Sequence, residues 1–295
     1  MLGIHASAYD GADRLTVEAK YSSDIVVDGI KDDGYGKMYA VEQQGIAHTE
    51  GLKLTTGNVT VAWNESDIYF YIEVYDQGTP YAVSNTDWQT DGPEFFLDLK
   101  NSKLASYDKD CFRVRVIAAK DSPDSKWDHW LSFNGSGTEN PISCATADDF
   151  KLAVRSINGK DWADGYAVEI SYKYSNHMDP ITNDYLMGWD VQICDDTLGF
   201  GSRDSQAFLG NPADVAHNNP SGFGSEIKFI GAANSAAAGD AKSAADNAPA
   251  AKPDATAEPA VATPQTSDSS IAFIGLALLL SLACFAGIKK AAIHK

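Results

Sequence analysis

One tryptophan and three polar residues have the side chains that a sugar site needs. Trp88 precedes a strand-like segment that begins at Glu94, and Arg113 and Gln192 lie in later segments of the same kind. An indole ring can stack on the C–H face of a sugar. Carboxylate, guanidinium and amide groups can bond to sugar hydroxyls, which both donate and accept hydrogen bonds. These residue types therefore favour non-covalent binding of a saccharide.

Alternating hydrophobicity predicts that most of these residues are carried by β-strands. Strands are predicted at 58–63, 68–75, 94–99, 111–118, 152–154, 166–170, 187–193 and 224–230. Seven or more short strands, separated by Gly, Asp and Asn loops and without a helical pattern, predict an all-β fold of the β-sandwich type. Glu94, Arg113 and Gln192 occupy polar positions of their strands, as does Asp190. If these strands share a sheet, the four side chains line one face, and Trp88 borders it.

The same residues also admit a structural arrangement. Glu94 and Arg113 could form a cross-strand ion pair, with Trp88 as a plug in a loop. This would leave a structural or adhesion domain with a degenerate sugar site. A glycosidase would need two carboxylates about 5–9.5 Å apart, one of them protonated. Glu94 with Asp98 or Glu169 could be imagined, but a neighbouring arginine favours the ionised form, so we predict no catalytic residue in this chain.

The composition argues against nucleic acid as a partner. The chain has 295 residues, with 23 Lys and Arg against 41 Asp and Glu, and a formal net charge of −18. Such a polyanion repels nucleic acid. Four scattered cysteines do not predict a disulfide framework. Asp28 and Asp32, with Asp33, could hold calcium through carboxylate oxygens, or they could form a solvated acidic turn.

Several short blocks resemble carbohydrate-binding module family 9. In the order of that family, they are VDGIKDD at 27–33, VAWNESDIYF at 61–70, WQTDGPEFFLD at 88–98, FRV at 112–114, GYAVE at 165–169 and PSGFG at 220–224. The resemblance implies a β-sandwich of the DOMON-like group with structural calcium. It also implies an aromatic clamp that grips the end of a polysaccharide or oligosaccharide, such as xylan or cellulose.

The resemblance also suggests roles for individual residues. By position, Trp88 matches one tryptophan of the clamp, and Glu94 and Arg113 match its polar contacts. Gln192 lies in the matching late strand. Near the place of the second tryptophan the chain has His217, whose smaller ring would supply a weaker second wall.

A DOMON-like fold also leaves a haem or redox domain as a rival function. Such a domain would need an axial methionine together with histidine or another ligand. Met38, Met178, Met187 and His177 are available, but their positions fit no ligand pattern.

The C-terminal part of the chain predicts attachment to a cell surface. We divide the chain into an N-terminal segment (1–18), the binding domain (19–231), a disordered Ala/Pro/Ser/Asp spacer (232–263) and a sorting signal (264–295). Residues 271–288 carry no charge and would give about 27 Å of transmembrane helix. Lysines follow this run, which suits a cytoplasmic end.

Pro264, Thr266 and Ser267 resemble the Leu-Pro-x-Thr-Gly signal that sortase cleaves in Gram-positive bacteria. This resemblance implies an extracellular domain attached to the cell wall, and a plain membrane anchor is the alternative. The first residues lack the pattern of a secretory signal. We therefore expect the chain to be the C-terminal part of a longer protein, such as a xylanase or another glycoside hydrolase.

Overall fold

β-strands form nearly all the regular structure of the described residues. The computed structural model describes residues 14–45, 54–76, 87–120, 127–134, 143–158, 164–198 and 201–232. Within these ranges the strands are β1 (Leu15–Tyr21), β2 (Tyr39–Val41), β3 (Gln43–Gln44), β4 (Thr56–Trp63), β5 (Ile68–Tyr75), β6 (Gly92–Asp98), β7 (Cys111–Lys120), β8 (Trp127–Asn134), β9 (Phe150–Ser156), β10 (Tyr166–Tyr172), β11 (Leu186–Asp195), β12 (Ser205–Phe208) and β13 (Ser225–Ile230). Short 3₁₀ turns include η1 (Asp87–Gln89), η2 (Ala147–Asp149), η4 (Tyr174–Asn176) and η5 (Pro220–Gly222).

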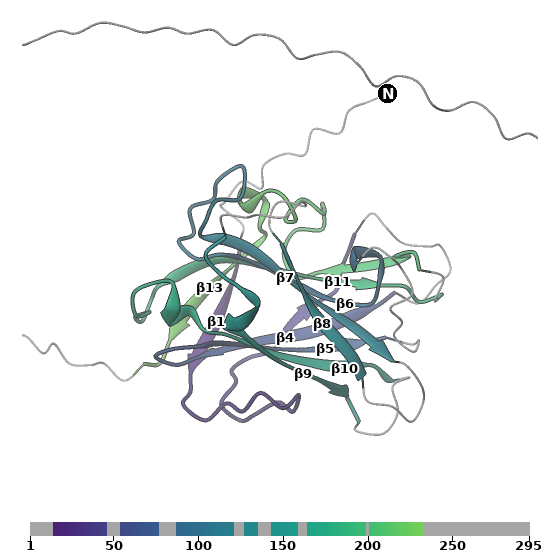
Figure 1. The fold of residues 1–295 in the computed structure, drawn as a ribbon, viewed down its shortest axis with the longest axis horizontal. Helices are drawn as coiled ribbons and strands as arrows, with labels where there is room; N and C mark the ends of the chain where they lie inside the picture. The colour runs from purple at the N-terminus through teal and green to yellow at the C-terminus, as the bar shows by residue number, and fades with distance from the viewer. Residues whose placement is uncertain are drawn as a thin grey trace, which may run out of the picture. The chain divides into compact units, whose positions relative to one another are not determined.

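The strands follow one hydrogen-bonded path that folds into two layers. Its order is β8-β7-β6-β11-β13-β1-β4-β5-β10-β9. Most neighbours are antiparallel, but β1 lies parallel to both β13 and β4. In Figure 1, β4, β5, β10 and β9 run together in one layer, and β6 and β11 lie in the other. The β13-β1 pair connects the two layers.

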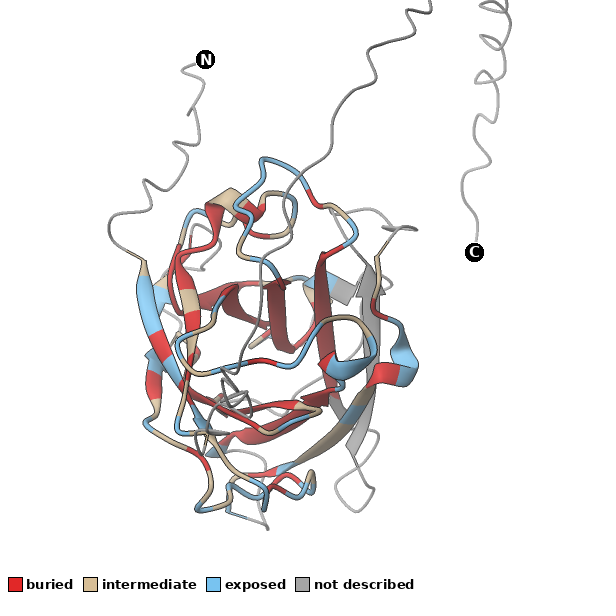
Figure 2. Ribbon diagram, turned by 90° about the vertical axis from the view of Figure 1, so that its left-hand side faces the viewer, coloured by how far each residue is buried: buried red, intermediate tan, exposed pale blue. Residues whose placement is uncertain are grey.

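Large apolar side chains fill the space between the layers. Phe70 of β5 stacks on Trp189 of β11, with ring centroids 5.9 Å apart. Phe112 of β7 meets Tyr172 of β10 edge-on at 5.0 Å. Figure 2 shows that the strands of both layers are largely buried. Each such side chain contributes about 1.5–3 kcal/mol when it leaves water, and this shared core confirms the predicted sandwich. Trp63 of β4 is also buried in this core.

The eight predicted strands are all present, but several others were missed. No strand was predicted at β8, yet it pairs with β7 along its whole length. β1 begins at Leu15, before the predicted domain boundary at residue 19. Its only buried side chains are Val17 and the small Ala19, so its hydrophobic alternation is weak. β2, β3 and β12 have between two and four residues, which is too short for a periodic signal.

The segment 22–38 covers the outer face of the β4-β5-β10 layer. It packs Ile25 and Tyr35 against Tyr69 and Tyr71 of β5 in a second buried cluster. Because both faces of β5 are covered, these tyrosines are buried although the sequence pattern predicts a polar outer face. Among the described residues, a smaller cluster around Phe96 covers part of the outer face of the β6-β7-β11 layer.

The predicted C-terminal anchor lies outside the described residues. This holds for the spacer, for Pro264, Thr266 and Ser267, and for the span 271–288. Within the described ranges, no helix has the length and apolar character needed to cross a membrane.

Candidate functional site

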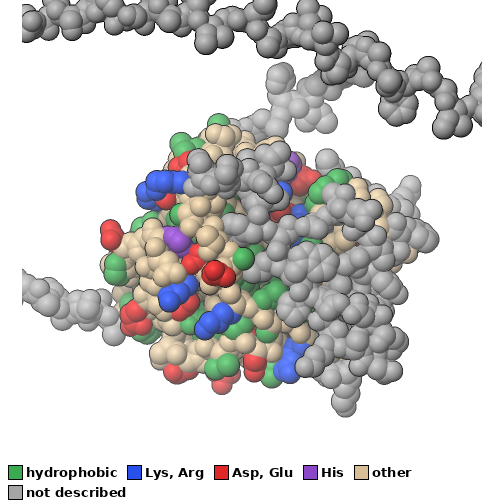
Figure 3. Space-filling model, in the orientation of Figure 1, with side chains coloured by type: hydrophobic (Ala, Val, Ile, Leu, Met, Phe, Trp, Pro, Cys, Tyr) green, Lys and Arg blue, Asp and Glu red, His purple; other side chains and the backbone are tan. Residues whose placement is uncertain are grey.

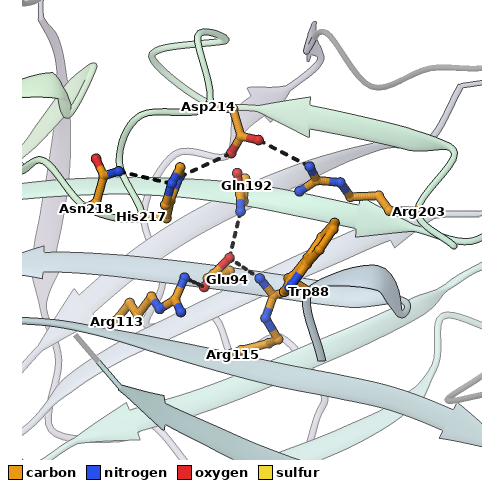
Figure 4. Close-up of a pocket in the computed structure, with 9 residues that line it drawn as sticks. All are labelled: Trp88, Glu94, Arg113, Arg115, Gln192, Arg203, Asp214, His217 and Asn218. Atoms are coloured by element: carbon orange, nitrogen blue, oxygen red, sulfur yellow. Dashed lines mark hydrogen bonds and ion pairs between the residues drawn. The ribbon is translucent and has the colours of Figure 1, made fainter. Parts of the chain in front are cut away.

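A pocket of about 390 Å³ opens on the outer face of the β6-β7-β11 layer. It is lined by Trp88, Glu94, Arg113, Arg115, Gln192, Arg203, Asp214, His217 and Asn218. Figure 4 shows Glu94 and Gln192 near its centre, with Trp88 on one side and His217 on the other. Five of the six residues predicted for sugar binding therefore lie in one pocket, and Asp190 does not.

Strand register places the polar residues of the pocket next to one another. Glu94 of β6 lies opposite Gln192 of β11 and opposite Arg115 of β7. Arg113 is two residues from Arg115 and therefore points to the same face. The alternate residues of β6, such as Phe95, point into the core. Because successive side chains of a strand point to opposite faces, the same three strands have an apolar inner face and a polar outer face.

Glu94 is the centre of a buried polar network. Its Oε1 lies 3.1 Å from Nη1 of Arg113, and its Oε2 forms an ion pair with Arg115. Nε2 of Gln192 donates to the same Oε2 at 2.6 Å. Glu94 is fully buried, so its charge requires these partners. The network fixes the carboxylate, and it leaves Oε1 of Gln192 without a hydrogen bond from any described residue.

Trp88 is held at the pocket rim by the short η1 turn. Its side chain is 45% exposed, so it is not the buried loop plug that the structural alternative requires. Cζ of Arg203 lies over the indole ring, 5.1 Å from the ring centroid. The remaining exposed indole surface is available to a ligand.

The opposite wall comes from the segment that follows β12. His217 is hydrogen-bonded to Asn218 at 3.2 Å, and its Nδ1 lies 3.7 Å from Oδ1 of Asp214. The other oxygen of Asp214 lies 3.2 Å from Nη2 of Arg203. Burial raises the pKa of Asp214, but the hydrogen bond from His217 and the charge of Arg203 outweigh this and hold the pKa below its usual range. Asp214 therefore links His217 to the arginine that lies over Trp88.

Asp190 has a different place from the one predicted. It is buried, and its carboxylate accepts hydrogen bonds from the backbone N–H groups of Val191, Gly210, Asn211 and Gly224. Burial raises its pKa to about 6 despite these four bonds. Asp190 thus fixes the loop that carries Asp214 and does not face a ligand. The strand pattern placed it on the correct face but could not show that a loop covers it.

The predicted calcium ligands Asp28 and Asp32 are engaged in turns. Asp28 Oδ1 accepts from the N–H of Ile30, and Asp32 Oδ2 accepts from the N–H of Val26, both at 2.8 Å. Among the described residues, the one group of metal-binding side chains lies elsewhere. It consists of Asp76, Asp91 and Asp195, whose ligand atoms lie within 4.8 Å of one another.

This acidic cluster has the chemistry of a calcium site. All three aspartates are buried, and carboxylate oxygens are the ligands that calcium prefers. Burial raises the pKa of Asp195 to about 6, and the charges of Asp204 and Asp196 add to this rise. Three buried carboxylates so close together repel one another, and a bound cation would relieve this repulsion. The residues therefore fit a calcium ion.

Sequence reasoning missed four residues of the pocket. Arg115 could have been found, because it lies two positions after Arg113 on one strand and so shares its face. Asp214 lies three residues before His217 in a loop. Arg203 and Asn218 also lie in loops, whose paths carry no periodic signal. The cluster of Asp76, Asp91 and Asp195 was missed because its members are far apart in the chain.

The residues considered for other functions lie away from this pocket. Glu169 points to the outer face of β10 in the other layer, so it cannot form a catalytic pair with Glu94. Asp98 is buried and accepts from the N–H of Lys103. Met187 is part of the core, and His177 Nε2 lies 2.8 Å from Asp149. None of these side chains lines the pocket.

Fold and pocket together define a β-sandwich binding domain. Residues 27–228 match the family model described as "Carbohydrate family 9 binding domain-like". The chain therefore belongs to this family, as the sequence blocks predicted.

The comparisons also identify individual relatives. The chain is 28% identical over 210 residues to endo-1,4-beta-xylanase A of Thermotoga neapolitana, which is 71% of this chain and 17% of the xylanase. It is 27% identical over 195 residues to endo-1,4-beta-xylanase C of Paenibacillus barcinonensis, covering 64% of this chain and 16% of that protein. The chain thus matches about one sixth of the length of each enzyme.

Solved structures support the same fold. A family 9 carbohydrate-binding module from Caldicellulosiruptor kristjanssonii, in complex with glucose, has a TM-score of 0.59 and 22% identity, covering 76% of this chain and 100% of that chain. Its complex with cellotriose gives the same TM-score and identity over 75% and 96% of the two chains. At 22% identity, the similarity to these two structures supports the fold of the chain and nothing beyond it.

Proposed function

We propose that the domain binds the ends of oligosaccharides or polysaccharides without covalent chemistry, in the pocket between Trp88 and His217. The observation that carries this proposal is an exposed indole beside a buried polar network with an unused acceptor. A sugar ring stacked on Trp88 would bring its hydroxyls to Glu94 and Gln192. The guanidinium groups of Arg113 and Arg115 would donate to hydroxyl oxygens.

The ligand class follows from the relatives. The matched solved structures are described in complex with glucose and cellotriose, and the matched proteins are xylanases. We infer that glucose- or xylose-based chain ends are the ligands. The domain would then direct a larger glycoside hydrolase, or the cell that displays it, to a polysaccharide.

Calorimetric titration of the chain with glucose, cellobiose and xylobiose tests this function. We expect saturable binding, and we expect Trp88→Ala to weaken it at least about tenfold, because the stacking surface is lost. Leu186→Ala is the matched control, since it truncates an apolar side chain that is 40% exposed outside the pocket. If Trp88→Ala binds these sugars as tightly as the wild type, the sugar does not bind in this pocket.

We also propose that calcium bound by Asp76, Asp91 and Asp195 stabilises the domain. Asp91 follows Trp88 by three residues, and Asp195 follows Gln192 by three, so the ion would anchor the edge of the pocket. Thermal unfolding with calcium and with a chelator should differ by several degrees. The difference should vanish in Asp91→Asn, and equal melting temperatures in the wild type would exclude this role.

The surface location is proposed from the sequence alone. Residues 264–295 would anchor the chain in the membrane or, after sortase cleavage between Thr266 and Ser267, in the cell wall. Transpeptidation of the chain by a Gram-positive sortase with a glycine-peptide acceptor should release the residues after Thr266. If the mass of the chain does not change under these conditions, a plain membrane anchor is favoured.

A further inference from the structure

One side of the pocket is carried by two stretches of chain that also contribute to the acidic cluster. Trp88 lies in η1, three residues before Asp91. Arg203 lies in the connection between β11 and β12, which begins directly after Asp195. Asp91 and Asp195 belong to the cluster together with Asp76, and the ligand atoms of the three lie within 4.8 Å of one another. The cluster and the pocket therefore depend on the same two stretches.

A buried hydrogen bond joins these two stretches. The backbone N–H of Asp196 donates to Oδ1 of Asp91 at 2.6 Å, and both residues are buried. The backbone carbonyl of Asp91 accepts from the N–H of Ala118 at 2.9 Å, which fixes Asp91 against β7. Asp91 therefore holds the beginning of the segment that leads to Arg203.

Asp195 holds the other end of this segment. Its backbone carbonyl accepts from the N–H of Asp204 at 3.0 Å. The carboxylate of Asp204 accepts from the N–H groups of Thr197 and Leu198, at 3.2 and 3.1 Å. Arg203 directly precedes Asp204, so these bonds also position Arg203.

Arg203 connects the segment to the indole of Trp88. Its Cζ lies 5.1 Å from the centroid of the indole, and its side chain is only 13% exposed. A guanidinium over an indole is attracted by the negative face of the ring. Because Trp88 is 45% exposed, the orientation of its ring depends on the contacts around η1, and Arg203 provides one of them. A shift of the segment would therefore disturb the surface on which a sugar stacks.

The acidic cluster is the part of this arrangement that a cation can stabilise. On the described part of the face in Figure 3, acidic side chains lie near Lys and Arg side chains at the surface. Asp195 differs, because it is 2% exposed and its Oδ1 has no hydrogen-bond partner among the described residues. Three ionised carboxylates this close repel one another. Without a cation, we expect the cluster to widen and both stretches to lose order.

We propose that cation binding by the acidic cluster and sugar binding in the pocket are coupled. The proposal rests on the proposed sugar-binding function and adds regulation of the same pocket by calcium. Asp91 and Asp195 are positioning residues, because they do not touch the sugar but hold Trp88 and Arg203 in place when a cation is bound. Since coupling between two binding sites is reciprocal, the sugar must raise the affinity for calcium by the same factor.

The test measures both affinities by calorimetry on the full chain. Cellobiose should bind about tenfold more tightly with calcium in excess than with EGTA, a factor typical of coupled sites. In the reverse titration, saturating cellobiose should raise the calcium affinity by the same factor. Circular dichroism identifies a temperature at which the chain remains folded in EGTA, so that unfolding does not cause the loss of affinity.

Variants then assign the coupling to the acidic cluster. Asp91→Asn should bind cellobiose with the same affinity in calcium and in EGTA, whereas Asp148→Asn should keep the difference. Asp148 is exposed and belongs neither to the pocket nor to the cluster, so it controls for the loss of one negative charge.

A second measurement follows Trp88 itself. Calcium should change the tryptophan emission of the sugar-free chain, because it fixes Arg203 over the ring of Trp88. Trp88→Phe should lose this change. An ion that only stabilised the fold, without positioning Trp88, would give the same calcium-dependent emission in Trp88→Phe as in the wild type.

Several outcomes would overturn the proposal. Equal wild-type affinities for cellobiose in calcium and in EGTA would exclude the coupling and leave the sugar-binding function intact. The wild-type titrations decide this point even if Asp91→Asn does not fold. A calcium dependence that persists in a folded Asp91→Asn variant would assign the effect to another site. Failure of cellobiose, glucose and xylobiose to bind in either condition would overturn the proposed function itself.

Discussion

The two layers of the sandwich each bury a glutamate on their outer face, and the two glutamates have opposite surroundings. Glu169 of β10 accepts hydrogen bonds from the backbone N–H groups of Asp28 and Gly29 and from the hydroxyl of Tyr35. Glu94 of β6 instead meets two guanidinium groups and an amide. Both glutamates have an exposed fraction of 0%.

The difference lies in what covers each glutamate. Segment 22–38 of the chain itself closes over Glu169, with Gly29 in a left-handed conformation at φ +83° that brings its N–H to the carboxylate. Over Glu94 the chain leaves a pocket with an exposed tryptophan at its rim. A buried carboxylate is therefore structural where the chain supplies its partners and its cover. Where charged partners remain beside an opening, as at Glu94, the carboxylate is part of the proposed binding site.

The largest expected effect concerns the covered glutamate. Glu169→Ala should lower the free energy of unfolding by about 3 kcal/mol, because two buried donors and one part-buried donor lose their acceptor. Urea unfolding followed by tryptophan fluorescence would measure this. Glu18→Ala, at an exposed position of β1, should change stability by less than about 0.5 kcal/mol. If Glu169→Ala is as stable as the wild type, segment 22–38 is not held by this residue.

A smaller effect is expected for sugar binding when Glu94, the glutamate beneath the pocket, is changed. Glu94→Gln should weaken saccharide binding about 30-fold, or ~2 kcal/mol, because it removes the charge that orients Arg113 and Arg115. Glu169→Gln is the matched control and should leave the calorimetric affinity unchanged. Equal losses in both variants would show that the two layers are coupled, and the contrast between them would be lost.

The smallest effect is a dependence of stability on pH. Burial raises the pKa of Glu169 above its ordinary value of 4.5, although three hydrogen bonds oppose the shift. The folded state therefore binds the proton more tightly than the unfolded state. The resulting stabilisation is complete below the unfolded pKa and is lost as the pH rises through the folded pKa.

Thermal melts of the wild type and Glu169→Gln at pH 5 and pH 7 would isolate this contribution. Asp190 shifts in the same direction, with a pKa of about 6, and is present in both proteins. The wild type should therefore gain more stability than the variant on going from pH 7 to pH 5. An identical gain in both would assign the whole dependence to other groups.

Periodicity explains which parts of the structure were predictable. A period of two placed Glu94, Arg113 and Gln192 on one face, and it could have added Arg115. It could not show that segment 22–38 covers one layer, because a loop has no repeat from which its path can be inferred. The pair of Arg203 with Asp214 and the cluster of Asp76, Asp91 and Asp195 also depend on loops or strand ends.

The parallel pairing of β1 with β13 has a consequence for the order of folding. Leu15 pairs with Ser225, and the same strand pairs with β4 on its other side. Such a contact has a very high contact order, which slows folding because a long loop must close before the pairing stabilises it. During synthesis, β1 leaves the ribosome first but gains its main partner only when β13 has emerged. The domain therefore closes as a unit after its last strand has been made, and until then β1 has an unpaired edge.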